Sequence, residues 1–120
     1  MSAATANELQ AKHCVPCEGG VPPLSADQVA KYLQAVPGWK LTTDGKRIRR
    51  EWRVKDFTEA LDFFNRVGRI AEEEDHHPDL HLTGYRQVAV ELSTHAVGGL
   101  TENDFILAAK IDQVPVELKK

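Results

Sequence analysis

The sequence lacks the features that mark three classes of protein: many cysteines, a long apolar run and an excess of basic residues. Its 120 residues include only two cysteines, Cys14 and Cys17. A disulfide between them would close a loop too small to stabilise the body of a fold. A disulfide-rich secreted scaffold is therefore excluded. The longest apolar stretches are a few residues, whereas a membrane-spanning helix needs roughly 20. A net charge of -3 argues against a broad nucleic-acid surface.

The residues that are present are typical of one ordinary soluble domain. Hydrophobic residues make up 42% of the chain and charged residues 28%. A chain of this length buries roughly two thirds of the surface that its unfolded form exposes, so one apolar core can hold it together. Residues 1–11 are polar and alanine-rich, without a basic start or an apolar run. We therefore expect no signal peptide and a cytoplasmic location.

The first 24 residues differ in composition from the rest of the chain. They contain a Gly-Gly pair, a Pro-Pro pair and few large apolar side chains, which predicts a flexible N-terminal arm over 1–24 and a folded domain over 25–120. Within the arm, Cys14 and Cys17 form a CxxC motif of the kind found in zinc ribbons and redox sites. No second CxxC completes a zinc site and no βαβ unit surrounds the motif. We expect a plain arm, and a zinc ion shared between subunits is the alternative.

Hydrophobic periodicity predicts three helices and four strands. The last helix begins with a capping box, in which Asp104 lies three residues after Thr101. The predicted segments in chain order are a helix over 25–36, strands over 39–42 and 47–54, a helix over 55–74, strands over 80–82 and 87–94, and a helix over 101–114. This order favours an α+β fold, with a four-stranded antiparallel sheet and helices packed on one face.

The long helix over 55–74 is expected to bury one apolar stripe. The stripe has the i, i+3, i+4, i+7 spacing of an amphipathic helix and consists of Phe57, Ala60, Leu61, Phe64, Val67 and Ala71. Because the residue before a proline disfavours helical geometry, Pro78 predicts that the helix ends before His77.

The basic residues between 46 and 53 form the one positively charged cluster. Trp52 is the only aromatic residue among them, and the remaining chain is acidic, so a nucleic-acid patch is disfavoured. We interpret the cluster as a solvated strand face.

Four of the five histidines lie between residues 76 and 95. His76 and His77 end the long helix, and His95 ends a strand that should return beside it. Three interpretations compete: surface histidines, a metal site, and acid and base catalysis, to which imidazoles are suited near neutral pH. Metal-binding helices space their ligands by three or four residues, and adjacent histidines rarely bind one ion together. We therefore expect no metal here, and we interpret His13 and His81 as bystanders.

Seven residues at fixed intervals form an ordered pattern across this region: Glu72, His76, His77, Pro78, Tyr85, His95 and Asp104. The pattern resembles the signature of the pterin-4a-carbinolamine dehydratases, known also as dimerization cofactors of a homeodomain transcription factor. The resemblance extends over residues 37–114 and includes Leu92-Ser93-Thr94-His95 and Gly99-Leu100-Thr101.

The resemblance implies dehydration of 4a-hydroxytetrahydrobiopterin to quinonoid dihydropterin and water, in tetrahydropterin recycling. By this resemblance the catalytic residues are His76, His77 and His95. It also implies that the substrate site includes six further residues: Glu72, Asp75, Ser93, Thr94, Ala96 and Asp104. The family needs neither a metal nor an organic cofactor. Loss of the C4a hydroxyl requires an acid and loss of the N5 proton a base, and we expect His76 and His95 to share these roles while His77 orients the substrate.

The resemblance also implies a homodimer or homotetramer and a functional link to an aromatic amino acid hydroxylase, without direct binding of nucleic acid or membrane. The alternative function is that of a dehydratase-like partner without catalysis, either a transcription coactivator or an assembly factor for a carbon-fixation complex. A fold can keep its shape while its role moves to an interface. The three histidines favour an enzyme, because a surface that only binds has no chemical need for them.

Overall fold

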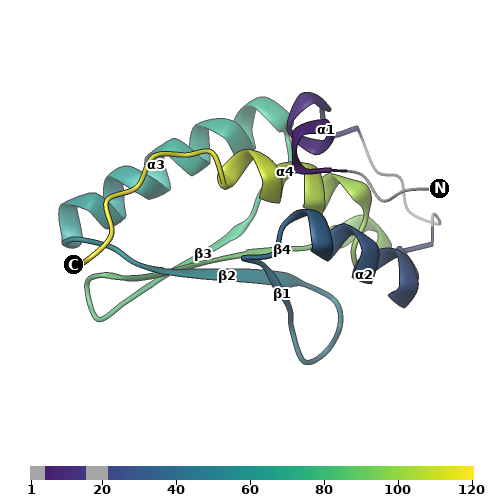
Figure 1. Ribbon diagram of the computed structural model, residues 1–120, viewed down its shortest axis with the longest axis horizontal. Helices are drawn as coiled ribbons and strands as arrows, with labels where there is room; N and C mark the ends of the chain where they lie inside the picture. Colours follow the sequence, from purple (N-terminus) through teal and green to yellow (C-terminus); the bar gives the residue numbers. More distant parts are fainter. Residues whose placement is uncertain (1–4, 16–21) are drawn as a thin grey trace.

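The computed structural model describes residues 5–15 and 22–120, and its long elements follow the predicted order (Figure 1). The elements are α1 (Ala6–Ala11), α2 (Ala26–Ala35), β1 (Lys40–Leu41), β2 (Ile48–Arg53), α3 (Phe57–Glu74), β3 (Asp79–Thr83), β4 (Gln87–Leu92), the short 3-10 helix η1 (His95–Val97) and α4 (Glu102–Ile111). The sequence did not predict α1 and η1. Cys17, the second cysteine of the CxxC motif, lies outside the described residues.

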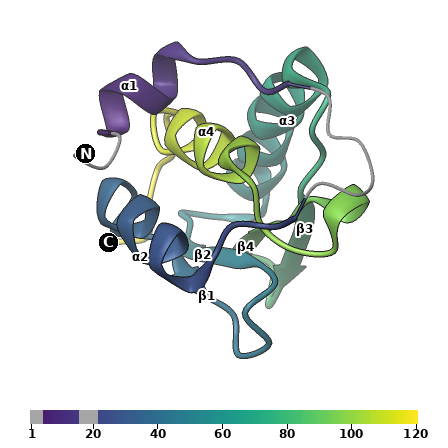
Figure 2. The same ribbon diagram turned by 90° about the vertical axis from the view of Figure 1, so that its right-hand side faces the viewer.

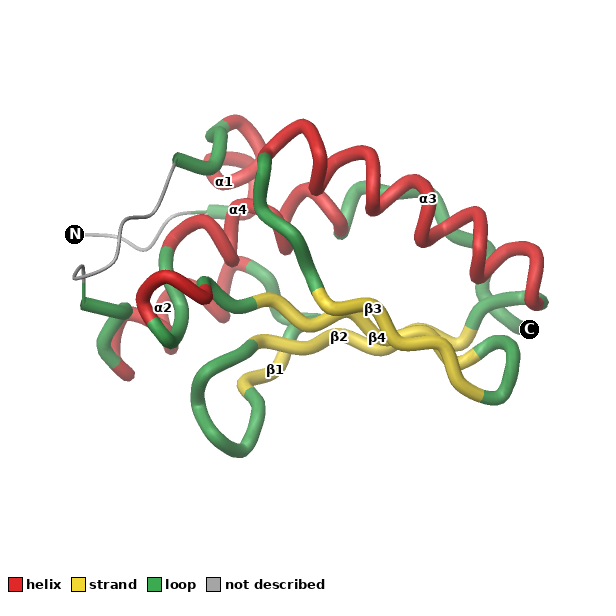
Figure 3. Tube along the Cα trace, turned by 180° about the vertical axis from the view of Figure 1, so that it is seen from behind, coloured by secondary structure: helices red, strands yellow, loops and turns green. Residues whose placement is uncertain are grey.

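The four strands form one antiparallel sheet with the order β1-β2-β4-β3. Val88, Val90 and Leu92 of β4 are buried, and so are Ile48 and Trp52 of β2, as the period of two along a strand predicts. The helices lie on one side of the sheet (Figures 1 and 3). These observations confirm the predicted α+β fold with its helices on one face.

Helix α4 forms the centre of the helical layer. Only Glu102 and Lys110 of its residues are partly exposed, and the others are buried. A helix that is buried all round needs packing partners on every side. The sheet lies on one side of α4, α2 and α3 lie beside it, and α1 lies on the side away from the sheet (Figure 2).

Residues 5–15 are packed rather than loosely attached. Thr5 caps α1 by accepting a hydrogen bond from the Glu8 backbone N–H at 3.2 Å, and Leu9 is fully buried against the core. The expectation of a flexible arm therefore does not describe this part of the segment. The segment packs because it covers the outer side of α4, which would otherwise be exposed to water.

Helix α3 buries a different row of side chains from the one predicted. Ala60, Val67 and Ala71 are buried as expected, but Phe63 is buried in addition and its ring lies 4.9 Å from that of Trp52. Phe57 and Leu61, which the sequence placed in the stripe, are about half exposed, and Phe64 is partly buried. Within the described residues no helix, α3 included, has the length and apolar character to cross a membrane.

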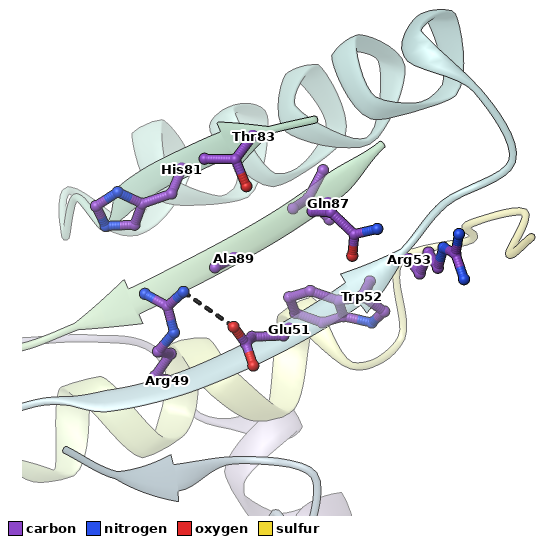
Figure 4. Close-up of a pocket in the computed structure, with 9 residues that line it drawn as sticks. Arg49, Glu51, Trp52, Arg53, His81, Thr83, Gln87 and Ala89 are labelled. Carbon is purple, nitrogen blue, oxygen red and sulfur yellow. Dashed lines mark hydrogen bonds and ion pairs between the residues drawn. The ribbon is translucent and has the colours of Figure 1, made fainter. Parts of the chain in front are cut away.

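The opposite face of the sheet is polar and carries Arg49 and Arg53 of the predicted basic cluster (Figure 4). Arg50 of the same cluster instead pairs with Asp112 at the end of α4, at 2.6 Å. Arg49 donates hydrogen bonds to Glu91 at 2.6 Å and to Glu51 at 3.0 Å, and Arg47 pairs with both Glu91 and Asp79. The hydrogen bond from Arg49 lowers the pKa of Glu91. The cluster is thus largely neutralised by neighbouring carboxylates, as expected of a solvated strand face.

Candidate active site

His76 and Asp104 form the centre of the candidate site. Asp75 ends α3 in the left-handed conformation, with a φ of 51°, so the chain turns away from the helix axis just before His76. Asp104 lies in the first turn of α4, and its Oδ1 is 2.6 Å from His76 Nε2. The side chain of Asp104 is fully buried and that of His76 is 12% exposed. The fold therefore brings together two predicted site residues that are 28 positions apart.

The buried Asp104 carboxylate accepts three hydrogen bonds. Besides His76, the Thr94 hydroxyl donates to Oδ2 at 2.9 Å and the Thr101 backbone N–H donates to Oδ2 at 3.0 Å. The second of these bonds belongs to the predicted capping box, which is confirmed. Because the single hydroxyl proton of Thr94 goes to Asp104, the 2.9 Å contact between the two threonine hydroxyls makes Thr101 the donor. The carboxylate also lies where the N-terminus of a helix favours negative charge.

This network fixes the tautomer of the His76 ring. An ionised carboxylate only accepts hydrogen bonds, so Nε2 of His76 must carry the proton that it donates to Asp104. In the neutral ring, Nδ1 then holds a lone pair and is able to accept a proton. A buried acid beside a histidine is the arrangement that orients general bases in enzymes.

Thr94 also determines where His95 lies. Its backbone N–H donates to the Gly99 carbonyl at 2.8 Å, which closes the loop that contains η1. Ser93 precedes this anchored threonine and is partly exposed, whereas His95 and Ala96 follow it and are exposed. The predicted residues of this strand end are thereby attached to the Asp104 network through one hydroxyl.

His77 and Glu72 form a separate pair beside this network. His77 Nε2 lies 3.3 Å from Glu72 Oε1, and both side chains are mostly exposed. Among residues 5–15 and 22–120, no group of three or more histidine, cysteine, aspartate or glutamate side chains could hold a metal ion.

Two buried polar residues next to the site, Glu74 and Asn103, were not predicted from the sequence. The Glu74 side chain is only 5% exposed, and it accepts hydrogen bonds from the Cys14 backbone N–H at 2.7 Å, from His13 Nδ1 at 3.0 Å and from Lys110 Nζ at 3.2 Å. The sequence did contain a signal for Glu74, because this residue continues the buried row of α3 three residues after Ala71. A carboxylate on an apolar stripe requires buried partners.

The surroundings of Glu74 set its protonation. Burial raises the pKa, but the hydrogen bonds from Cys14, His13 and Lys110 and the charge of Lys110 outweigh burial and lower the pKa to about 2. Since the folded-state pKa lies below the ordinary value of 4.5, the carboxylate stabilises the fold fully above that pH, and this contribution is lost as the pH falls towards 2.

We predict that Glu74→Gln makes the free energy of unfolding depend less on pH in the acid range. The difference in unfolding free energy between the wild type and this variant should shrink between pH 5 and about pH 2, as measured by urea unfolding at each pH. Glu73→Gln, which changes an exposed carboxylate on the same helix, is the control and should leave the pH dependence unchanged. A Glu74→Gln effect of constant size over this range would contradict the prediction.

Comparison with known proteins assigns the chain to a family. The family model described as pterin 4 alpha carbinolamine dehydratase matches residues 22–114, which include every residue of the site. The chain belongs to this family. The pterin-4-alpha-carbinolamine dehydratase match includes Glu74 and Asn103 but not residues 13–15, which contact them from outside the matched region.

Individual relatives of the dehydratase family agree with this match. Pterin-4-alpha-carbinolamine dehydratase 2, mitochondrial, from Arabidopsis thaliana is 54% identical over 113 residues, which cover 92% of this chain and 60% of that protein. A relative from Rubrobacter xylanophilus is 46% identical over 90% of this chain and 99% of its own. The crystal structure of a transcriptional coactivator/pterin dehydratase from Brucella melitensis has a TM-score of 0.70 and 33% identity, and covers 75% of this chain and 95% of that chain.

Proposed function

We propose that the chain dehydrates a pterin-4a-carbinolamine, giving quinonoid dihydropterin and water. The observation that carries the proposal is the His76 ring, which a fully buried Asp104 holds in one tautomer at the rim of the helical layer. The names of the relatives describe the same reaction, and the bacterial relative is matched over nearly its whole length.

The reaction moves two protons on the substrate. The bond from C4a to the hydroxyl oxygen breaks, a proton joins that oxygen so that it leaves as water, and the proton on N5 is lost as the double bond between C4a and N5 forms. In our proposal Nδ1 of His76 accepts the N5 proton and His95 delivers the proton to the hydroxyl. The exposure of His95 allows it to recover its proton from solvent.

The remaining predicted residues surround the substrate in this proposal. His77, paired with Glu72, orients the pterin, and the exposed Asp75 directly precedes His76 at the end of α3. Ser93 and Ala96 flank Thr94 and His95 at the strand end and contact the ring. No metal or organic cofactor takes part.

Activity of the purified chain tests the proposal. We expect it to accelerate the dehydration of a freshly generated 4a-hydroxytetrahydropterin, followed by the absorbance of the quinonoid product. His95→Ala should lower kcat/KM by about 10²- to 10⁴-fold, the usual worth of a general acid or base. His81→Ala is the matched control, since His81 lies on the polar face of the sheet among the residues drawn in Figure 4. A folded chain that gives no acceleration would leave the coactivator or assembly role as the better account.

The proposal includes the oligomeric state of the chain, its metabolic role and its location in the cell. A second copy of the chain would cover the half-exposed Phe57 and Leu61 of α3, giving a homodimer or homotetramer, which light scattering measures. The substrate is the product of aromatic amino acid hydroxylation, so the enzyme would act in tetrahydrobiopterin recycling beside such a hydroxylase, in the cytoplasm.

A further inference from the structure

Residues 13–15 contact two buried side chains that are sequence neighbours of the His76–Asp104 pair. Glu74 lies two residues before His76, at the end of α3, and Asn103 lies directly before Asp104, at the start of α4. The N-terminal segment thus touches both elements whose ends carry the pair.

The contact with Asn103 consists of two hydrogen bonds to one residue. The Val15 backbone N–H donates to Asn103 Oδ1 at 3.0 Å, and Asn103 Nδ2 donates to the Val15 carbonyl at 2.7 Å. The Cys14 thiol lies 3.5 Å from the Asn103 carbonyl oxygen. Since Asn103 is 4% exposed, these bonds are shielded from competing water.

The contact with Glu74 joins the same segment to the other side of the pair. Cys14 and His13 bind the Glu74 carboxylate, and Lys110 binds it from α4. One carboxylate therefore links the end of α3, the N-terminal segment and α4. Cys14 and Val15 are consecutive, so a single stretch of backbone spans from the residue near His76 to the residue next to Asp104.

The position of His76 depends on such links. It follows the left-handed Asp75 and lies beyond the last residue of α3, so helix geometry alone does not fix its distance from α4. The 2.6 Å bond to Asp104 requires that the end of α3 and the start of α4 keep their relative position. Misplacement of a reacting group by about 1 Å can cost about 10²-fold in rate.

We propose that residues 13–15 form a clamp that positions His76 against Asp104 for proton transfer, with Glu74 and Asn103 as positioning residues. This inference rests on the proposed dehydratase function. The clamp touches no reacting atom, and it acts by holding the end of α3 to the start of α4.

Asn103→Ala tests the clamp. We expect kcat to fall about 10- to 100-fold while KM changes less than about threefold, because the substrate contacts remain and only the base is displaced. Proton NMR of the His76 Nε2–H gives a second readout, and its hydrogen-bonded signal should shift or broaden in the variant. Asn65→Ala is the control, since it makes the same substitution at an exposed residue of α3 outside both the clamp and the site. It should match the wild type in both readouts.

Glu74→Gln provides a second variant that keeps the size of the side chain. It loses the charge that binds His13 and Lys110, so we expect the same fall in kcat and the same change in the His76 signal. This variant keeps the clamp testable if Asn103→Ala fails to fold. If either folded variant keeps the wild-type kcat and the wild-type Nε2–H signal, the clamp is overturned. An inactive wild type would refute the proposed function instead, and the NMR signal would still decide whether the clamp positions His76.

Discussion

Asp104→Asn should lower kcat by about 10²- to 10⁴-fold while the chain stays folded. An asparagine offers one acceptor oxygen and one NH₂ group, whereas the Asp104 carboxylate accepts from Thr94 and Thr101 on one oxygen and from His76 on the other. The asparagine oxygen would keep the two donors on the Oδ2 side. Its NH₂ group would then face Nε2 of His76, which could remain hydrogen-bonded only by giving up its proton.

The substitution therefore inverts the tautomer of His76. The ring proton moves to Nδ1, and the nitrogen that accepts the substrate proton in our proposal loses its lone pair. Steady-state kinetics with the carbinolamine measure the loss, and nitrogen NMR of the histidine ring distinguishes the two tautomers. A variant with an inverted tautomer and an unchanged kcat would show that His76 Nδ1 is not the base.

Asp104→Ala separates the structural role of the carboxylate from its chemical role. It removes the buried acceptor of the Thr101 backbone N–H and of the His76 ring N–H. Loss of one partner of a buried pair costs about 3–5 kcal/mol. Urea unfolding should therefore show a large loss for Asp104→Ala and a much smaller one for Asp104→Asn. Equal losses would mean that shape, rather than hydrogen bonding, accounts for the effect of Asp104.

The sequence predicted the local features of this site but not its connections. The capping box of Thr101 and Asp104 spans three residues, and turn and cap preferences are enough to reveal it. The bond between His76 and Asp104 crosses 28 residues, and only the packing of α3 beside α4 brings its two ends together. The family resemblance named both residues without saying that they touch.

The long helix shows a related limit of sequence patterns. Residues 57–74 carry two apolar rows, and a period of 3.6 identifies both without saying which faces the sheet. Phe63 faces it because Trp52 offers a ring to pack against, whereas Phe57 and Leu61 stay about half exposed. Glu74 then falls on the buried row, where the partners from residues 13–14 and α4 satisfy its carboxylate.

The N-terminal segment was the least predictable part, because its composition suggested an arm. One large apolar residue, Leu9, buries this segment against the outer side of α4, and residues 13–15 add hydrogen bonds to Glu74 and Asn103. The apolar run Phe105–Ala109 of α4 was the available signal, because five consecutive apolar residues surround the helix and need a cover on each side. The fold therefore begins upstream of the region that the family model matches.

Leu9→Ala should destabilise the chain by about 2–5 kcal/mol, the usual cost of truncating a fully buried leucine. The substitution keeps helix propensity, since alanine favours a helix at least as well as leucine, so the loss would report packing against α4 rather than unwinding of α1. Urea unfolding measures it as a lower midpoint with an unchanged m-value. Leu118→Ala is the matched control, because this leucine is more than half exposed, and its cost should stay within about 0.5 kcal/mol. If Leu9→Ala costs no more than Leu118→Ala, α1 does not stabilise α4, and the folded domain begins at α2 as the composition alone suggested.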